Sequence, residues 1–390
     1  MSEWRETDFG KIPNHWELKK VIDIKSNDKR AIAMGPFGSN IKAENFVEYG
    51  VPVIRGTNLN YAKYVDGEFV FLTEKKADEL IGSNCKSGDL VFTHRGTIGQ
   101  VGLVPSKFPR YVISQSGMKL SVNSDLIDNE FLFYFFKSEF GQFQILKYES
   151  QVGVPSISNP LTSLKEIEVP VPPLPEQKSI ASILSCLDDK IDLLHRQNAT
   201  LEKIAETLFR QWFVEEAMED WEEGKLSDLV FVKYGKDHKK LLDGKIPVFG
   251  SGGLMRYAEK SLYDKESVLI PRKGTLSNVM YQDEPFWTVD TMFYTEMKVP
   301  NVAKFVYHFL KDQDLASMNV GSAVPSMTTE ILNNMPLDTP PKEVFEKFEG
   351  AVAPLYAKTK SNQNQIRTLT ALRDTLLQKL MSGGVLVKTC

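Results

Sequence analysis

The sequence predicts an α+β protein in which two similar mixed α/β domains are joined by two long helices. Three observations predict this fold class. Short motifs recur in the same order in both halves of the chain, each half ends in a long heptad pattern of apolar residues, and β-rich runs punctuated by glycine and proline precede each pattern. A chain of 390 residues is also too long for one ordinary hydrophobic core, so two or more domains are expected.

The internal repeat consists of five short matches in the same order in both halves. The separation between partners shrinks along the chain from 205 to 168 residues, so the first copy carries 37 more residues in its loops. A duplication explains ordered matches of this kind better than chance does. The pairs are Trp16-Glu17 with Trp221-Glu222, Val51-Pro52-Val53 with Ile246-Pro247-Val248, Arg95-Gly96-Thr97-Ile98 with Lys273-Gly274-Thr275-Leu276, Val154-Pro155-Ser156-Ile157 with Val324-Pro325-Ser326-Met327, and Pro172-Pro173 with Pro340-Pro341.

The first α/β domain, residues 1–171, and the second, residues 216–338, are expected to combine short strands with one helix each. In the first domain the predicted strands are Val51–Ile54, Asp89–Phe92, Val101–Val104 and Met118–Val122, and the predicted helix is Glu130–Leu146. In the second domain the predicted strands are Ile246–Phe249, Ser267–Ile270, Val279–Gln282 and Met292–Met297, and the predicted helix is Val302–Lys311.

Residues 172–215 and 339–384 are each predicted to form one long helix. Apolar residues alternate steps of four and three over 33 residues, about 50 Å of helix, which is the a/d pattern of a coiled coil. Pro175 suits a first helical turn, and Gly383-Gly384 suits the end of the second helix. The a/d positions are Ile180, Leu184, Leu187, Ile191, Leu194, Asn198, Leu201, Ala205, Leu208 and Trp212 in the first copy, and Phe348, Val352, Leu355, Thr359, Asn362, Ile366, Leu369, Arg373, Leu376 and Leu380 in the second.

These two apolar stripes are expected to pack against each other. A stripe also occurs on a helix that lies on its own domain core, but this one is narrow and longer than one modest domain needs. Two similar halves meet most naturally about an internal pseudo-two-fold axis, which makes the helices antiparallel. Asn198 and Asn362 would then lie near the middle of the contact, where a buried polar group can fix the register of the helices.

Composition and charge narrow the class of protein. A net charge of -4 and a pI of about 5.9 exclude a uniformly basic nucleic-acid coat and leave room for a local basic face. The three cysteines, Cys85, Cys186 and Cys390, form no CxxC pair, so neither a disulfide framework nor a cysteine zinc site is predicted. The N-terminus has no apolar signal core, and no apolar run is long enough to span a membrane. A cytoplasmic protein is expected.

The sequence shows no motif for catalysis or metal binding. The five histidines, His15, His94, His195, His238 and His308, form no HExxH or HxH arrangement, and neither GxSxG nor a phosphate-binding GxxxxGK[ST] occurs. Gly250–Gly253 after Phe249 superficially resembles the glycine-rich loop of a methyl-donor site, although no helix is predicted to follow it. A stand-alone DNA methyltransferase that uses this loop is therefore an alternative function, and a coiled-coil scaffold without a DNA role is another.

Two loops combine the groups that bind phosphates and bases. His94-Arg95-Gly96-Thr97 and Arg272-Lys273-Gly274-Thr275 each follow a predicted strand and supply a cation, a flexible glycine and a hydroxyl. A tight turn with a solvated cation would look the same, but recurrence in both halves favours function. Lys236 and Lys239 belong to a lysine-rich loop, residues 233–245. Such a cluster is usually a solvated loop, but beside a nucleic-acid face it would steer DNA. Four further side chains have the chemistry that recognises base edges: Arg55, Asn58, Gln115 and Arg256.

Several of these motifs together resemble the specificity subunit of type I restriction-modification systems. The resemblance covers both repeats and is most specific at Pro172-Pro173-Leu174-Pro175-Glu176-Gln177 and the helix after it. In the second copy Lys342-Glu343-Val344-Phe345 replaces the Leu-Pro-Glu-Gln pattern. The other matching segments are Gly35-Pro36-Phe37-Gly38-Ser39-Asn40, Val53-Ile54-Arg55-Gly56, Arg95-Gly96-Thr97-Ile98-Gly99, and Leu187-Asp188-Asp189-Lys190-Ile191.

The resemblance implies a non-catalytic protein whose α/β domains each recognise one half of an asymmetric, bipartite site in double-stranded DNA. It implies that the helices form an antiparallel coiled coil that sets the half-site separation; a length of about 50 Å corresponds to roughly 15 base-pair steps. The implied partners are two adenine-N6 methyltransferase subunits and translocating endonuclease subunits, and S-adenosylmethionine, ATP and Mg²⁺ are implied for those partners only. Acidic residues are expected away from the DNA or against the partners: Asp188, Asp189, Asp192, Glu215, Glu216, Glu219 and Asp220.

Overall fold

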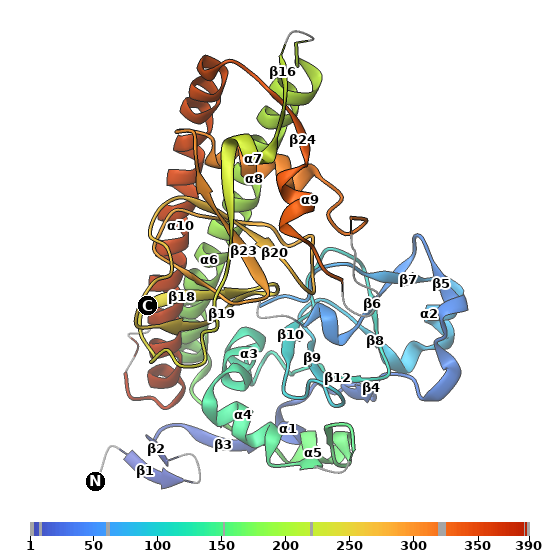
Figure 1. The fold of residues 1–390 in the computed structure, drawn as a ribbon. Coiled ribbons are helices and arrows are strands. Elements are labelled where there is room, and N and C mark those ends of the chain that lie inside the picture. Colours follow the sequence, from blue (N-terminus) through green and yellow to red (C-terminus); the bar gives the residue numbers. More distant parts are fainter. Residues whose placement is uncertain are drawn as a thin grey trace. The chain divides into compact units, whose positions relative to one another are not determined.

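The computed structural model describes residues 4–7, 10–59, 63–150, 153–218, 221–318, 325–385 and 387 (Figure 1). The chain divides into two compact units, Met1–His195 with Gln363–Cys390, and Arg196–Asn362. Each unit therefore contains one α/β domain and part of both long helices. We call the α/β part of the first unit head 1 and that of the second unit head 2. Among the described residues no helix is long and apolar enough to cross a membrane.

Head 1 is built on two small sheets. The first has the order β10-β9-β12-β4, and the second has the order β5-β7-β6-β11-β8, with β6 and β11 parallel. The strands are β10 (Val101–Leu103), β9 (Leu90–Thr93), β12 (Gly117–Leu120), β4 (Ile32–Met34), β5 (Phe46–Val47), β7 (Val70–Leu72), β6 (Val51–Ile54), β11 (Tyr111–Ile113) and β8 (Asn84–Cys85). Around them lie β1 (Trp4–Thr7), β2 (Gly10–Pro13), β3 (Glu17–Lys20), α1 (Val21–Ile24), α2 (Glu74–Glu79), β13 (Glu149–Ser150), β14 (Ser156–Ile157), α5 (Pro160–Glu166) and β15 (Glu168–Val171).

Head 2 repeats the four-stranded sheet of head 1 and the three central strands of its second sheet. Its sheets have the orders β17-β23-β20-β21 and β19-β18-β22, with β18 and β22 parallel. The strands are β17 (Val230–Tyr234), β23 (Met292–Met297), β20 (Ser267–Pro271), β21 (Met280–Gln282), β19 (Gly253–Ala258), β18 (Ile246–Gly250) and β22 (Trp287–Thr288). Around them lie β16 (Glu222–Lys225), α7 (Leu226–Leu229), α8 (Ala303–Asp312), α9 (Thr329–Asn333) and β24 (Pro336–Thr339).

The duplication predicted from the sequence extends to strand register. In head 1 the parallel pair places Val53 opposite Val112, and in head 2 it places Val248 opposite Trp287. Val53 and Val248 belong to the matched Val-Pro-Val and Ile-Pro-Val motifs. Because a shift of one residue would turn every side chain to the other face of the sheet, equal register means that equivalent residues point the same way in both heads.

The helical segment predicted over residues 130–146 is confirmed, except that it is interrupted at Ser138. The chain forms α3 (Asn129–Lys137) and α4 (Glu139–Leu146), separated by Ser138 in an extended conformation. The Ser138 side chain accepts a hydrogen bond from the Gly141 N–H, so the serine caps the second helix. A Cβ on Gly141 would lie 2.0 Å from the Phe135 carbonyl oxygen, which is why the second helix can approach the first so closely.

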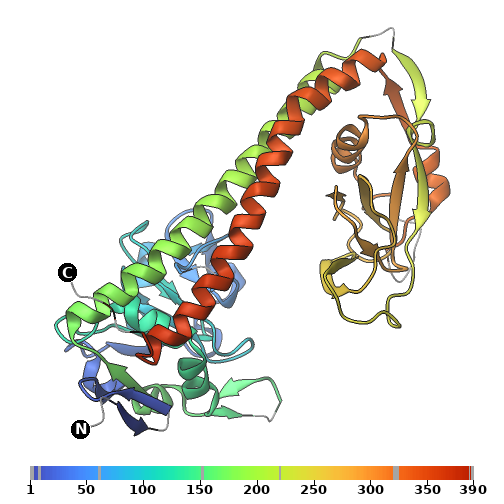
Figure 2. The same ribbon diagram turned by 90° about the vertical axis from the view of Figure 1, so that its left-hand side faces the viewer.

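The two long helices are α6 (Leu174–Arg210), which continues into a π-helical turn at Gln211–Glu215, and α10 (Lys342–Met381). They pack antiparallel in each unit (Figure 2): Leu377 and Leu380 of α10 share a core with Ile180 and Leu184 of α6, and Phe345 and Phe348 share another with Phe209. Every predicted a/d position is buried or partly buried. The coiled-coil pattern is thus confirmed. At the end of α10, Gly383 has a φ of 68° and its N–H donates to Leu380, as expected for a helix stop.

The predicted asparagine pair is present. The Asn362 amide nitrogen donates to Asn198 Oδ1 at 2.9 Å, and the Asn362 side chain is fully buried. Pro175 lies in the first turn of α6, as predicted, whereas α10 contains an internal proline, Pro354.

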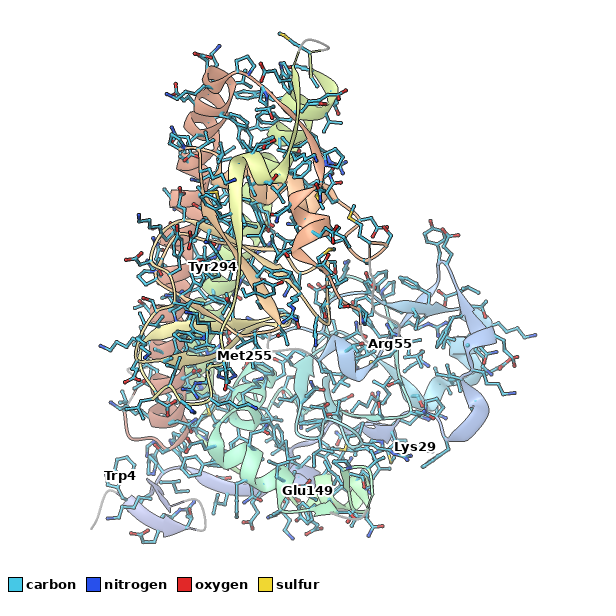
Figure 3. All side chains as sticks on the ribbon, in the orientation of Figure 1. Trp4, Lys29, Arg55, Glu149, Met255 and Tyr294 are labelled. Carbon is cyan, nitrogen blue, oxygen red and sulfur yellow. The ribbon has the colours of Figure 1, made fainter. Side chains whose placement is uncertain are left out.

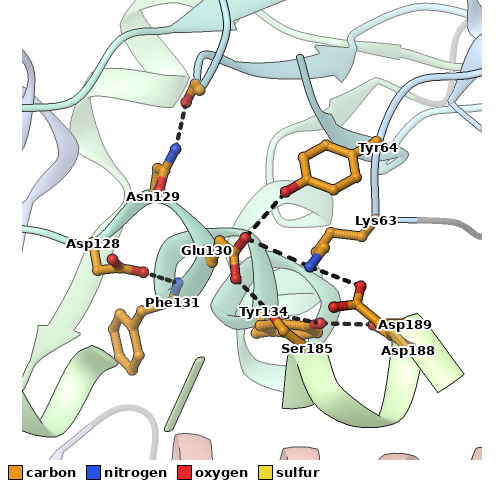
Figure 4. A network of polar contacts seen from close by, with 11 residues as sticks. Lys63, Tyr64, Asp128, Asn129, Glu130, Phe131, Tyr134, Ser185, Asp188 and Asp189 are labelled. Carbon is orange, nitrogen blue, oxygen red and sulfur yellow. Dashed lines mark hydrogen bonds and ion pairs between the residues drawn. The ribbon is translucent and has the colours of Figure 1, made fainter. Parts of the chain in front are cut away.

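Head 1 is attached to α6 by a polar network (Figure 4). The Lys63 ammonium lies 3.5 Å from Glu130 and 3.2 Å from Asp189, and Ser185 donates to Glu130 at 2.5 Å. Burial alone lowers the pKa of Lys63, but these carboxylates outweigh burial and the pKa is raised. Asp188 accepts from Tyr134 at 2.8 Å and pairs with Arg373 at 2.8 Å. Asp188 and Asp189 are therefore engaged in ion pairs within the unit. Their expected place, away from the DNA or against the partners, stays a prediction; Glu219 and Asp220 lie outside the described residues.

The Leu-Pro-Glu-Gln motif has a structural role at the same junction. Glu176 accepts a hydrogen bond from the Trp16 indole at 3.1 Å. Gln177 is fully buried; it accepts from the Asp128 N–H at 2.7 Å and donates to the carbonyls of Leu126 and Pro172. Buried polar groups are costly unless paired, so these bonds fix how the helix leaves head 1.

Candidate nucleic-acid interface

The two cation-glycine-hydroxyl loops follow equivalent strands, β9 in head 1 and β20 in head 2. The Gly96 N–H donates to the Pro155 carbonyl at 2.9 Å, and the Gly274 N–H donates to the Pro325 carbonyl at 3.1 Å. Both glycines have positive φ values, 85° and 90°, which side-chain-bearing residues rarely adopt. Two motifs that the sequence repeat identified separately are thus joined in the same way in each head.

Each loop also holds a turn that precedes a central strand, residues 114–116 before β12 and residues 289–291 before β23. His94 Nε2 lies 3.1 Å from the Gln115 carbonyl oxygen, and Arg272 Nη1 donates to the Asp290 carbonyl at 3.0 Å. Main-chain bonds add to this: His94 N–H donates to Ser116, and Arg272 N–H donates to Thr291, both at 2.9 Å. His94 and Arg272 differ chemically but make the equivalent contact with the turn in the two heads.

A glycine completes the arrangement in each head. The Gly35 N–H donates to the Gly117 carbonyl and the Gly235 N–H to the Met292 carbonyl, both at 2.9 Å. A Cβ on Gly35 would lie 1.8 Å from the Ser114 oxygen, and one on Gly235 would lie 2.1 Å from the Val289 oxygen. Only glycine fits there. The sequence comparison missed this equivalence because the glycine is the sole identity between Gly-Pro-Phe and Gly-Lys-Asp.

We call these four converging segments the loop platform. It comprises residues 35–37, 94–97, 114–116 and 155–157 in head 1, and residues 235–237, 272–275, 289–291 and 325–327 in head 2. Its exposed side chains include Phe37, Arg95, Thr97 and Gln115 in head 1, and Lys236, Lys273, Thr275 and Asp290 in head 2. The charged ends of Arg95 and Lys273 make no hydrogen bond or ion pair with any described residue, so both remain available to an anion.

Several predicted DNA-contacting residues form hydrogen bonds within their own loops. Arg55, labelled in Figure 3, donates to the Glu68 carbonyl at 3.2 Å. Asn58 is 1% exposed; its oxygen accepts from the Arg55 N–H, and its nitrogen donates to the Asp66 and Glu68 carbonyls. The base contact predicted for Asn58 is not available in this conformation, because the amide is used to shape its own loop.

His94 and Arg256 have similar supporting roles. His94 is buried, and burial lowers its pKa, so at neutral pH it is an uncharged holder of the turn rather than a phosphate-binding cation. Arg256, on β19, donates to the Leu241 carbonyl at 2.6 Å and lies 3.7 Å from Asp243. These bonds tie Arg256 to the lysine-rich loop, and the base contact predicted for it stays a prediction.

The lysine-rich loop of head 2 lies beside the platform turn. The Lys236 N–H donates to the Thr288 carbonyl at 2.9 Å, and the Trp287 indole donates to the Lys236 carbonyl at 2.8 Å. Lys236 and Lys239 are exposed. The loop therefore adds positive charge next to Asp290, at an edge of head 2 that already carries Lys273.

The glycine-rich segment that the methyltransferase alternative depends on is a hairpin. Gly250 and Gly253 pair across the turn between antiparallel strands β18 and β19, and Asn278 donates to the Ser251 carbonyl at 2.9 Å. A strand follows the glycines, whereas a methyl-donor loop of the expected kind leads into a helix whose N-terminus faces the ligand. In the part of the chain that the structure describes, no group of three or more metal-binding side chains occurs.

Comparison with known proteins places this arrangement in a family. The sequence pattern described as the type I restriction modification DNA specificity domain matches residues 17–203 and 218–371. The specificity subunit of the type I restriction enzyme MjaIX of Methanocaldococcus jannaschii is 28% identical over 433 residues, covering 99% of this chain and 97% of that subunit. The HindI specificity subunit of Haemophilus influenzae is 22% identical, covering 77% of this chain and 87% of that subunit.

The fold is also similar to a solved structure. The crystal structure of the type I restriction-modification S subunit from M. genitalium matches with a TM-score of 0.61 and 19% sequence identity, over 94% of this chain and 96% of that one. Because the family pattern matches both repeats and most of the chain, the resemblance predicted from the sequence is confirmed, and this chain belongs to the type I restriction-modification specificity subunit family.

Proposed function

We propose that each head recognises one half of an asymmetric, bipartite site in double-stranded DNA through its loop platform. The observation that carries this proposal is the construction of one platform twice from the same hydrogen bonds, with an exposed cation and an exposed threonine at equivalent positions. Cations and hydroxyls of this kind hold phosphates and set the orientation of a protein on the duplex, whereas other side chains supply sequence recognition.

The helix pair is proposed to set the separation of the two half-sites. Helix α6 has 37 residues, which corresponds to about 55 Å. A length of this order spans roughly 16 base-pair steps at 3.4 Å each. The antiparallel contact and the buried asparagine pair support a defined length, because a helix pair with a specified register does not slide.

We further propose that the chain itself has no catalytic role and acts in the cytoplasm within a larger complex. Two adenine-N6 methyltransferase subunits that bind S-adenosylmethionine, and endonuclease subunits that use ATP and Mg²⁺, would supply the chemistry. Membership in the specificity subunit family supports this assignment. The hairpin at Gly250–Gly253 favours it over a stand-alone methyltransferase.

Methylation-site mapping in a host that carries the complete system tests the proposal. The expected result is methylated adenines in two short specified sequences separated by a fixed number of unspecified base pairs. A complex without any sequence preference would overturn DNA recognition and favour a scaffold. Methyl transfer by the purified chain alone, with labelled methyl donor and DNA, would overturn the non-catalytic assignment.

A further inference from the structure

The two platforms differ in hydrogen-bonding chemistry at the tip of the turn. Head 1 has Gln115 there and head 2 has Asp290, whereas the neighbouring loop positions keep their chemistry, with Arg95 matched by Lys273 and Thr97 by Thr275. An asymmetric target needs such a difference. Positions that present the same groups in both heads cannot by themselves distinguish two different half-sites.

The main chain of this turn is held in the same way in both heads. In head 1 the Ser114 N–H donates to Ile54 and the Gly117 N–H donates back to Ser114, both at 2.9 Å. In head 2 the Val289 N–H donates to Phe249 and the Met292 N–H to Val289, both at 3.0 Å. The tip carbonyl is bound by His94 in head 1 and by Arg272 in head 2. Rigid support of this kind is what a specific contact requires.

The side chains at the tip have no internal role. Gln115 and Asp290 are exposed, and neither side chain forms a hydrogen bond or ion pair with a described residue. Positive residues belong to the same platform as Asp290: Arg272 binds its carbonyl, and Lys273 and Lys236 lie on other segments of the platform. A carboxylate on a surface that approaches DNA is repelled by the phosphates. Such a carboxylate is favourable there only if it accepts a hydrogen bond that offsets this repulsion.

We propose that this tip residue recognises a base in the major groove, with Asp290 accepting from the exocyclic amino group of cytosine and Gln115 pairing with adenine. This proposal rests on the proposed function. Cytosine presents an amino donor there, whereas adenine presents its amino group beside the N7 acceptor. N7 would repel a second carboxylate oxygen, so Asp290 suits cytosine. The amide of Gln115 carries both a donor and an acceptor and matches the adenine edge.

The test uses the complete complex and a library of DNA targets in which both half-sites and their flanks are randomised. Asp290→Asn keeps the size of the side chain and replaces one acceptor by a donor. At one position of the half-site contacted by head 2, preference for cytosine should fall by roughly 5- to 150-fold, the range of one specific base contact. Preferences in the other half-site should stay unchanged. Gln115→Glu should act in the same way on one adenine in the half-site of head 1.

Asp264→Asn is the matched control. Asp264 is exposed and precedes β20, whereas the platform loop follows that strand, so the two lie at opposite ends of it. The control should leave every base preference unchanged. Affinity for unrelated DNA should remain equal or rise in Asp290→Asn, because a negative charge is removed from the contact surface.

The outcomes separate this inference from the proposed function. If the wild-type complex selects a bipartite site and Asp290→Asn selects it with the same preferences, the role of the tip residue is wrong and the proposed function stands. If the wild-type complex selects no bipartite site, the proposed function itself fails. Equal thermal unfolding of variant and wild type excludes misfolding, and is expected because the Asp290 carboxylate has no hydrogen-bond or ion-pair partner in the described part of the chain.

Discussion

In each platform loop one side chain supports the turn, and the next side chain along the loop is available to contact a ligand. His94 and Arg272 bind the tip carbonyl and hold the turn, and the Arg272 guanidinium also lies over the Tyr234 ring, 5.3 Å from its centroid. The side chains of the next residues, Arg95 and Lys273, form no hydrogen bond or ion pair with any residue that the structure describes. The sequence pattern therefore located the correct loops but did not distinguish the supporting residue from the free cation, because both positions in head 2 are basic.

This division predicts different effects of alanine substitutions on DNA binding. Arg95→Ala or Lys273→Ala should weaken binding to all sequences and reduce the slope of log affinity against log salt by about 0.9 each, the value for one phosphate contact. Arg272→Ala should instead disturb recognition in the half-site of head 2, because the Asp290 turn loses its support. Affinity titrations between low and moderate salt measure the slope. An unchanged slope for Arg95→Ala and Lys273→Ala would contradict phosphate contact.

A buried histidine in head 2 makes stability depend on pH. His308 is 2% exposed, bonds Tyr356 at 2.9 Å and stacks on Phe209; burial, with a smaller effect of Lys311, lowers its pKa to about 4. The unfolded chain binds this proton near pH 6.5 and the folded chain near pH 4, so stability falls as pH drops through that window. Between pH 7.5 and pH 5.5 we expect a loss of about 1.4 kcal/mol.

Chemical denaturation of wild type and His308→Gln at both pH values isolates this effect. On acidification the wild type should lose about 1.4 kcal/mol more stability than the variant, because the other titrating groups are common to both. Equal losses would show that His308 does not contribute.

At the scale of elements, the long helices were the most predictable feature, and the break between α3 and α4 was the least predictable. The heptad pattern is local and sustained, and the a/d positions predicted from it are buried or partly buried. The break at Ser138 interrupts a run that is apolar on all sides, because α3 buries Phe131 through Phe136. Periodicity cannot show where such a helix ends. Only the capping serine, which is unremarkable in the sequence, marks the boundary.

The buried asparagine pair is expected to specify the helix register. Replacing both Asn198 and Asn362 by leucine removes the 2.9 Å hydrogen bond and should stabilise the helices while allowing other registers or oligomers. Light scattering and thermal unfolding measure both effects. Asn364→Leu, an exposed change on the same helix, is the control. A double variant with unchanged assembly and unchanged melting would contradict a role in register.

For the whole molecule, the net charge of -4 does not describe the charge near the platforms. Free cations lie on the platform loops of both heads, whereas Asp188 and Asp189 are paired with Arg373 and Lys63 at the base of head 1. Part of the negative charge is therefore neutralised inside the protein. An acidic pI is compatible with a DNA-binding surface for this reason.

The proposed spacer role predicts the effect of lengthening the helices. Four residues inserted beside Asn198 in α6, matched by four beside Asn362 in α10, add about 6 Å, or roughly two base-pair steps. An insertion of four preserves much of a heptad seam. Sites mapped for the complete complex should keep both half-sites and gain a longer or differently phased spacer. The same insertion between Asp264 and Lys265 should change nothing, and an unchanged spacer in the helix variant would refute the spacer role.

The sequence by itself determined the duplication, the antiparallel helix pair, the loops Arg95–Thr97 and Lys273–Thr275, and the family, because these depend on order, spacing and period along the chain. Tertiary structure alone decided which polar residues remain exposed. Asn58, His94 and Arg256 have the chemistry of DNA contacts, yet their partners are backbone carbonyls brought close only by folding. The equivalence of Gln115 and Asp290 also depends on the tertiary structure. The hydrogen bonds that hold their turns join segments far apart in the chain, and contacts of this kind produce no periodic pattern in the sequence.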